Sequence, residues 1–206
     1  MTEDIFTLNG KRSLTIVLDR TGSMGWAIDA LVNFLPMYLI RRFAQDIDQM
    51  SLVTFDDHYR GHPLNVGATN DENDQPAYNA NVLDAYGPTS NLEEYAYWLK
   101  TVKLGYGADP EEAIACALAA ARKLDPEASI WLVTDNAPHG SDLGYNSDFF
   151  PVGCPCDVLL DTSGVNVLLL GYQANNYWTM RCPERVVLVQ DLSEKLQEPV
   201  GELAYA

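Results

Sequence analysis

The sequence is poor in positive charge and has no long apolar run. Its 206 residues include 29 acidic but only 13 basic side chains, so the formal net charge is −16 at pH 7. This balance repels nucleic acid and anionic lipid, and we predict neither a nucleic-acid partner nor a membrane. No stretch approaches the roughly 20 apolar residues of a membrane span, and the acidic start "MTEDIFTLNG" is unlike a secretory signal. These absences predict a cytoplasmic protein.

Cysteine is also scarce. The chain has four cysteines, Cys116, Cys154, Cys156 and Cys182, and 47% of its residues are hydrophobic, which is enough to fold without disulfides. We therefore expect reduced thiols. A zinc site built from Cys154, Cys156, Cys182 and His139 is disfavoured, because the Cys-x-Cys spacing lacks the usual pair of Cys-x-x-Cys hooks. The role of Cys154 and Cys156 stays open.

Several enzyme motifs are missing as well. The chain has no Gly-x-x-x-x-Gly-Lys-Ser/Thr phosphate loop, no Gly-x-Ser-x-Gly elbow and no Gly-x-Gly-x-x-Gly dinucleotide pattern. It also lacks an Asp-x-Asp motif after its first strand. We therefore expect a protein that is not an enzyme. A metal-dependent phosphoesterase is the competing hypothesis, since aspartates at strand ends with magnesium also occur in phosphoryl-transfer enzymes.

What the sequence does contain is an alternation of apolar strands and helices, which is typical of a parallel sheet covered by helices. Strands are predicted at 13–19, 50–55, 128–135, 165–172 and 184–191, and helices at 26–45, 91–103, 110–124 and 192–196. Ser90 or Asn91 would cap the second helix, and Pro110, Glu111 and Glu112 would open the third. Residues 56–75 are predicted to form a hairpin or loop, and 77–90 either an edge strand or irregular chain. We expect one α/β domain over 1–206 with its core at about 13–192.

Two of the predicted strands end in aspartate: Asp19 follows "LTIVL" and Asp135 follows "WLVT". In an open parallel sheet the ligand crevice lies at the carboxyl ends of the strands, so these side chains are expected to converge. Buried carboxylates repel one another and are costly unless a cation meets them. Asp19, Thr21 and Ser23 supply the oxygen ligands that hard cations prefer. Ordinary helix capping by the same residues is the alternative.

The residues "LDRTGSMG" resemble the metal-ion-dependent adhesion site of von Willebrand factor type A (vWA) domains, with its Asp-x-Ser-x-Ser signature. The segments "GYGADPEEAIACALAAARKL" and "ASIWLVTDNAPHG" are similar to the bacterial and alpha-kinase-associated branch of that family, and "GCPCD" also resembles it. The resemblance implies a Rossmann-like, doubly wound, mostly parallel sheet with one antiparallel edge strand and helices on both faces. It also implies a divalent metal held directly by Thr21 and Ser23, and largely through water by Asp19 and Asp135.

Two residues near this motif leave alternatives open. The loop "LGYGADP" has no hydroxyl where the family has a threonine, so Asp109 is either a replacement ligand or only a charge at a helix N-terminus. Arg20 either points to solvent or pairs with Asp19.

The predicted function is that of a protein-interaction module. The metal, Mg²⁺ or else Mn²⁺ or Ca²⁺, would be held by Asp19, Thr21, Ser23, Asp135 and Asp109 and would capture a carboxylate of a partner protein. The family resemblance suggests a component of an ATPase or kinase system as that partner. A scaffold with a purely structural or degenerate metal site is the alternative.

Overall fold

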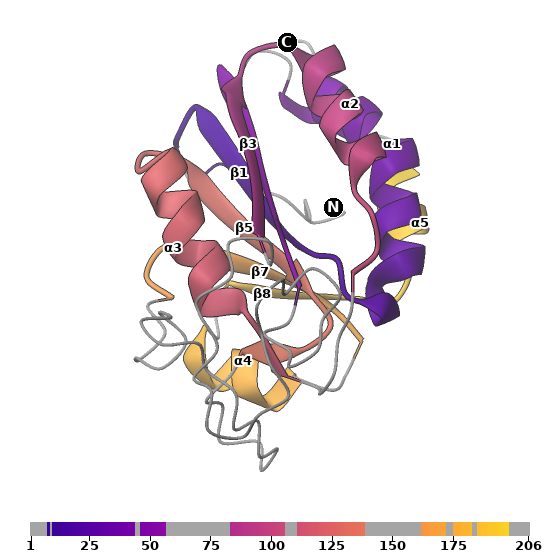
Figure 1. Cartoon of the computed structure of the whole chain (residues 1–206), viewed down its shortest axis with the longest axis vertical. Coiled ribbons are helices and arrows are strands. Elements are labelled where there is room, and N and C mark those ends of the chain that lie inside the picture. The colour runs from indigo at the N-terminus through magenta and orange to yellow at the C-terminus, as the bar shows by residue number, and fades with distance from the viewer. Residues whose placement is uncertain are drawn as a thin grey trace, which may run out of the picture.

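The chain folds around a twisted six-stranded sheet, as the computed structural model shows (Figure 1). The structure describes residues 8, 10–43, 46–56, 83–105, 111–138, 162–171, 175–182 and 185–197. The strands of this sheet are β1 (Ser13–Asp19), β2 (Gln49–Phe55), β3 (Leu83–Thr89), β5 (Ser129–Thr134), β7 (Val165–Leu170) and β8 (Val186–Val189). Their order is β3-β2-β1-β5-β7-β8. All neighbours are parallel except β2 and β3, so β3 is an antiparallel edge strand.

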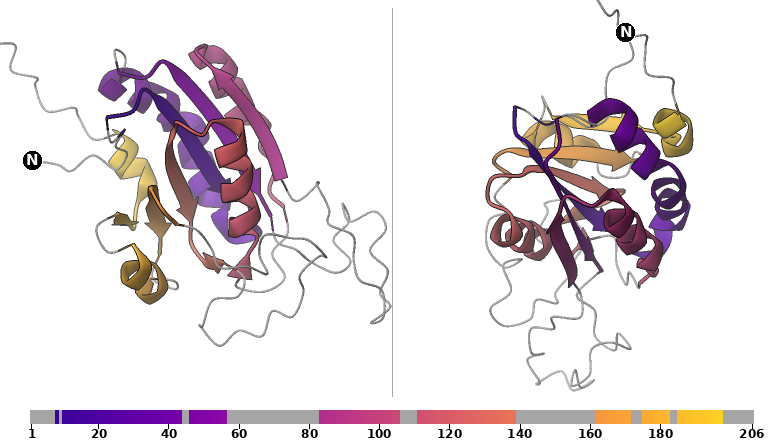
Figure 2. Two further views of the ribbon diagram at one scale, coloured as in Figure 1. Left: turned by 90° about the vertical axis from the view of Figure 1, so that its left-hand side faces the viewer. Right: turned by 90° about the horizontal axis from the view of Figure 1, so that it is seen from above.

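Helices cover both faces of the sheet (Figure 2). One face carries α1 (Gly25–Phe43), α2 (Leu92–Thr101) and α5 (Leu192–Gln197), and the other carries α3 (Ile114–Leu124) and α4 (Asn175–Arg181). These observations confirm the predicted fold class.

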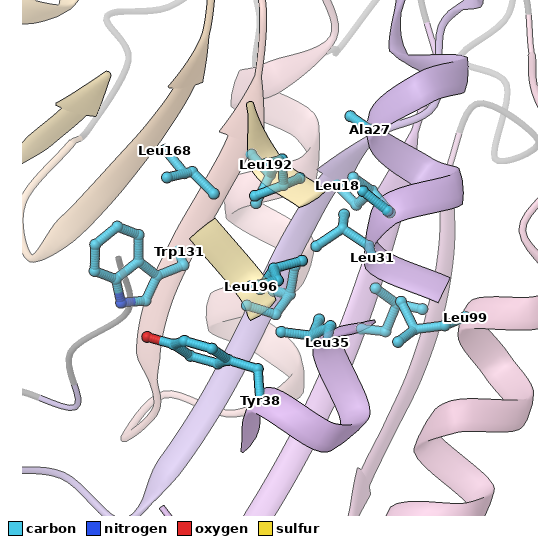
Figure 3. Close-up of a cluster of buried hydrophobic side chains, with 14 of the residues drawn as sticks. Leu18, Ala27, Leu31, Leu35, Tyr38, Leu99, Trp131, Leu168, Leu192 and Leu196 are labelled. Atoms are coloured by element: carbon cyan, nitrogen blue, oxygen red, sulfur yellow. The ribbon is translucent and has the colours of Figure 1, made fainter. Parts of the chain in front are cut away.

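Each face of the central strands packs into its own hydrophobic core, because successive side chains of a strand point to opposite faces. In β1, Leu14, Ile16 and Leu18 face the core beneath α1, while Val17 faces the core beneath α3. Figure 3 shows the first core, where Leu31 and Leu35 of α1 lie among side chains of the sheet, α2 and α5. Burial on both faces explains why these strands lack polar alternation.

Helix α1 is also rich in apolar residues because it is buried in the core. Within the described part of the chain, residues 22–42 form the one helix that is long and apolar enough, by length and composition, to cross a membrane. Its side chains Ala27, Leu31, Leu35 and Leu39 belong to the core, and a buried core helix passes the same test. From the sequence alone, no candidate span was predicted in this region.

The structure differs from the predicted elements at two places. The third helix begins at Ile114, because Glu111–Glu112 (β4) pairs instead with Ala137–Pro138 (β6) in a small parallel sheet. Helix α4 was not predicted. The segment at 77–90, predicted as either an edge strand or irregular chain, contains the edge strand β3. Most of the predicted loop at 56–75 lies outside the described residues.

The strand order places the predicted site. From β1 the chain passes to β2 and β3 on one side, and its later strands β5, β7 and β8 extend the sheet on the other side of β1. The order therefore reverses between β1 and β5, which is where open α/β sheets bind ligands at the carboxyl ends of their strands. Asp19 ends β1 and Asp135 directly follows β5.

Candidate functional site

Asp19 is fully buried at the end of β1 and is held by neutral donors. Its Oδ1 accepts hydrogen bonds from the backbone N–H of Thr21 at 2.9 Å and from the Thr21 hydroxyl at 2.7 Å. Its Oδ2 accepts from the Thr134 hydroxyl at 2.8 Å. Burial raises the pKa of Asp19 to about 7, although these hydrogen bonds oppose the rise and the nearby charge of Asp135 adds to it.

The two hydroxyls of the predicted motif lie together beside this carboxylate. Thr21 is buried and extended, and its Oγ1 lies 3.4 Å from the Oγ of Ser23. Ser23 is exposed in the short 3₁₀ turn Gly22–Met24 that leads into α1. A Cβ on Gly22, between the two hydroxyl residues, would meet no atom of the described residues within 4 Å.

Asp135 reaches the same site from β5. It is half-buried, and burial raises the pKa of its carboxyl, while a hydrogen bond with Ser23 lowers it. The Asn136 amide donates to Asp135 Oδ1 at 3.2 Å, and the backbone N–H of Asn136 donates to Thr134 Oγ1 at 3.1 Å. Trp178 of α4 in turn donates its indole N–H to the Asn136 carbonyl at 2.8 Å. The structure thus brings together Asp19, Thr21, Ser23 and Asp135.

Other predicted residues lie outside the described part of the chain. These are Asp109 of the third loop, together with His139, Cys154 and Cys156. The remaining cysteines, Cys116 and Cys182, are buried.

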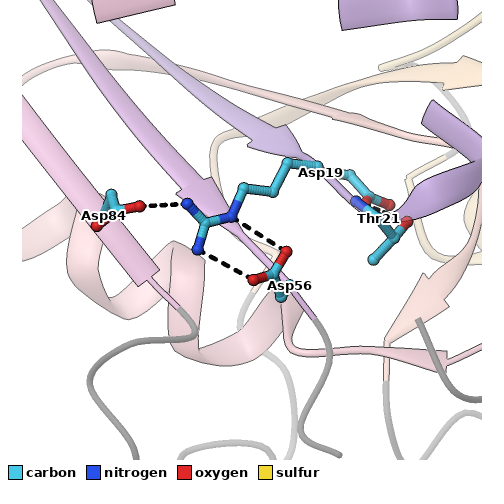
Figure 4. Close-up of polar contacts among 5 residues, drawn as sticks. Asp19, Thr21, Asp56 and Asp84 are labelled. Atoms are coloured by element: carbon cyan, nitrogen blue, oxygen red, sulfur yellow. Dashed lines mark hydrogen bonds and ion pairs between the residues drawn. The ribbon is translucent and has the colours of Figure 1, made fainter. Parts of the chain in front are cut away.

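Arg20 takes neither of its two predicted positions. Its side chain is buried and pairs with Asp56, which directly follows β2, and with Asp84 of β3. Figure 4 shows Asp56 and Asp84 on one side of this strand end and Asp19 with Thr21 on the other. The guanidinium therefore does not neutralise Asp19.

The donor set fits a hard divalent cation. Every ligand candidate is an oxygen, from two carboxylates and two hydroxyls, and the buried Asp19 has no cationic partner among the contacts described above. In the described part of the chain no three histidine, cysteine, aspartate or glutamate side chains converge. A cation here would therefore depend on the hydroxyls as well as the carboxylates.

Exposed apolar side chains border the site. Trp26, one helical turn beyond Ser23, is 46% exposed, and Leu104, beyond the end of α2, is 54% exposed. Leu104 packs against the start of α1, since a Cβ on Gly25 would lie only 3.3 Å from its side chain.

Sequence reasoning missed Thr134 and Asp56. Thr134 precedes Asp135 directly in "LVTD", but a hydroxyl that points back at another strand leaves no local pattern. Asp56 follows a buried strand just as Asp19 and Asp135 do, and this signal was present in the sequence.

Comparison with known proteins supports the fold. No family model and no curated protein matches the chain. Solved structures of proximal thread matrix protein 1 (PTMP1) from the mussel byssus are similar. The one with a zinc-occupied MIDAS motif and a second crystal form each show 12% identity and a TM-score of 0.53, covering 92% of this chain and 46% of theirs. A third structure of PTMP1 shows 17% identity and a TM-score of 0.51, covering 92% and 44%.

At this identity the likeness shows a vWA-like fold and no more. The chain spans less than half the length of the solved chains that it matches.

Proposed function

We propose that this protein is a binding module that holds a divalent cation, Mg²⁺ or else Mn²⁺ or Ca²⁺, and uses it to capture a carboxylate of a partner protein. One observation carries the proposal: a fully buried carboxylate, which has only neutral donors among the described residues, lies beside a second carboxylate at the switch point of the sheet. A buried carboxylate without a cation is costly, so a fully buried and a half-buried carboxylate side by side suit a cation. The zinc-occupied motif of the similar PTMP1 structure agrees with this chemistry.

The proposed ligands are of two kinds, neutral hydroxyls and charged carboxylates. Thr21 and Ser23 present neutral oxygens, whereas Asp19 and Asp135 carry the charge. Thr134 fixes the orientation of Asp19, and the side-chain amide of Asn136 orients Asp135, as second-layer partners do at metal sites. A bound divalent cation would supply positive charge between the carboxylates and a coordination position for an external carboxylate.

We propose Asp109 as a further ligand in place of the family's threonine. Glu111, two residues after Asp109, pairs in register with Ala137, two residues after Asp135. The alternative, in which Asp109 only places a charge at a helix N-terminus, is less favoured. Helix α3 begins only at Ile114, more than a turn beyond Asp109.

The surroundings of the site suit a protein partner better than a free small anion. Trp26 and Leu104 offer exposed apolar surface beside the hydroxyls, and aromatic side chains are common anchors of protein interfaces. We propose a cytoplasmic partner, such as a component of an ATPase or kinase system. We assign no catalytic residue. Hydrolysis of a phosphate ester that is lost in Asp19→Ala would favour the enzyme hypothesis instead.

Thermal unfolding tests the metal. The protein is first treated with EDTA and then titrated separately with Mg²⁺, Mn²⁺, Ca²⁺ and Zn²⁺. A cation at about 100 times its Kd stabilises a folded protein by about 2.7 kcal/mol, and we expect a rise in Tm of about 5–11 °C. Asp19→Ala, Ser23→Ala and Asp109→Ala should reduce this rise. Asp29→Ala, which removes an exposed carboxylate from α1, should keep it.

The capture of a carboxylate needs a separate test. Random peptides displayed on phage are selected on the protein in Mn²⁺ and eluted with EDTA. We expect enriched peptides to share an aspartate or glutamate, and synthetic copies with asparagine or glutamine at that position should not bind. Metal-dependent stabilisation without any acid-dependent peptide would contradict capture and favour a structural metal.

A further inference from the structure

Arg20 stands between two proposed cation ligands, Asp19 and Thr21, yet its side chain is bound elsewhere. We infer that Arg20 is a positioning residue, which holds the first loop in the conformation that presents Asp19 and Thr21 to the cation. The inference rests on the proposed function. It adds a residue that contacts neither the cation nor the partner.

The side chain of Arg20 is held by two carboxylates on neighbouring strands. Nε and Nη2 donate to the two oxygens of Asp56 at 3.1 and 3.0 Å, and Nη1 donates to Asp84. A planar guanidinium bound in this forked way has one orientation, which a flexible ammonium does not have. Because side chains alternate along an extended chain, fixing residue 20 on this side turns residues 19 and 21 to the other side.

The backbone of Arg20 is fixed as well. Its N–H donates to the carbonyl of Phe55 at 2.9 Å, and its carbonyl accepts from the N–H of Gly105 at 2.8 Å. One residue therefore joins the end of β1 to β2, to β3 and to the segment that follows α2.

Gly105 packs tightly against the Asp56 side chain. A Cβ at this position would lie 1.6 Å from Oδ1 of Asp56, so the carboxylate occupies the space of the missing side chain. No other residue fits here unless Asp56 or the loop moves. The contact places the Asp56 carboxylate between Arg20 and the segment after α2.

A second pair at the opposite end of β1 provides a comparison. Arg12 donates to both oxygens of Asp48 at 2.5 and 2.6 Å, with the same separation of 36 residues as Arg20 and Asp56. The pair at Arg12 is exposed, with 59% and 57% of its side chains accessible, whereas the pair at Arg20 is accessible by 8% and 0%. An exposed pair is enough to bridge β1 and β2 at one end. Burial, which is costly for an ion pair, is confined to the end that carries the cation site.

The experiment compares Arg20→Lys and Gly105→Ala with the control Arg12→Gln. Arg20→Lys keeps the charge opposite Asp56 but loses the fork, and Gly105→Ala displaces Asp56 without changing any charge. Mn²⁺ affinity is measured by isothermal titration calorimetry on the full chain. We expect both variants to bind Mn²⁺ at least tenfold more weakly, as is usual for residues that support metal ligands, and the control to stay within twofold.

A second measurement needs no metal. The backbone N–H of Thr21 donates to Asp19, so its hydrogen exchange in EDTA reports on the loop conformation. We expect exchange at Thr21 to accelerate at least tenfold in Arg20→Lys and Gly105→Ala, relative to the amide of Ile16 within β1. In Arg12→Gln this ratio should not change.

The outcomes separate the inference from the proposed function. If Arg20→Lys lowers the resistance to urea but leaves both Mn²⁺ affinity and Thr21 exchange as in the wild type, Arg20 is merely structural and the inference is wrong. If the wild type binds no cation, the proposed function fails, and Thr21 exchange alone then decides whether Arg20 positions the loop. If Arg20→Lys does not fold, Asp84→Asn is tested in its stead. Asp84 is 45% accessible and accepts from only one nitrogen of the Arg20 guanidinium, Nη1.

Discussion

Replacing Asp19 by asparagine should make the metal-free protein more stable at neutral pH. Asparagine has nearly the same shape as aspartate. Its oxygen can accept from Thr21 as Oδ1 does, and its amide can donate to the Thr134 hydroxyl, which accepts as well as donates. The substitution therefore removes the buried charge while it keeps most of the hydrogen bonds.

The expected size follows from the pKa of Asp19, which burial raises from 3.8 to about 7. A carboxyl whose pKa is higher in the folded state binds its proton more tightly there. Its stabilising contribution is fully present below about pH 4 and is lost as the pH rises to about 7. At about 1.4 kcal/mol for each pKa unit, the loss is about 4 kcal/mol. The advantage of Asp19→Asn over the wild type should therefore grow by about 4 kcal/mol between pH 4 and pH 8.

Urea unfolding in EDTA at several pH values measures this difference. All other groups titrate in both proteins, so their contributions largely cancel in the comparison. Mn²⁺ at pH 8 should then stabilise the wild type and leave Asp19→Asn unchanged. A difference in the free energy of unfolding that stays constant from pH 4 to pH 8 would refute the reasoning, since the Asp19 carboxylate would then be fully compensated without a cation.

Further predictions concern single side chains. Thr134→Val should lower the free energy of unfolding by about 1–3 kcal/mol in urea, because Asp19 loses a donor and the backbone N–H of Asn136 loses an acceptor. Tyr95→Phe should be neutral or stabilising by about 1 kcal/mol in the same assay, since the buried Tyr95 hydroxyl has no hydrogen-bond partner among the described residues. Trp26→Ala should change stability by less than about 0.5 kcal/mol and yet weaken the binding of acid-containing peptides, measured by fluorescence anisotropy.

Much of the fold could be predicted because its signals are local. Strands such as β5 and β7 are buried on both faces and stand out as unbroken apolar runs. Ser90 and Asn91 were the two predicted caps of α2. The cap in the structure is Asn91, whose side chain accepts from the backbone N–H groups of Glu93 and Glu94. Asp19 and Asp135 could be placed together because strands of a parallel sheet end at one edge.

The errors come from contacts between distant segments. The two residues of β4 look like the acidic first turn of a helix, and only their pairing with Ala137–Pro138 makes them a strand. The partners of Arg20 are equally hidden, because Asp56 and Asp84 become its neighbours only when β2 and β3 join the sheet. Helix α4 is short and contains asparagine, threonine and tryptophan, which are weak helix formers, so its local signal is faint.

The strand order also affects how the protein folds while it is being synthesised. The hydrogen bond from Thr134 to Asp19 spans 115 residues, so the two halves of the site are synthesised at different times. At roughly 5–20 residues per second, Thr134 is made on the order of ten seconds after Asp19. During this interval one edge of β1 has no partner, because β5 does not yet exist. A nascent chain can therefore form the pair of β1 and β2, but the proposed cation site can form only after β5 has been added.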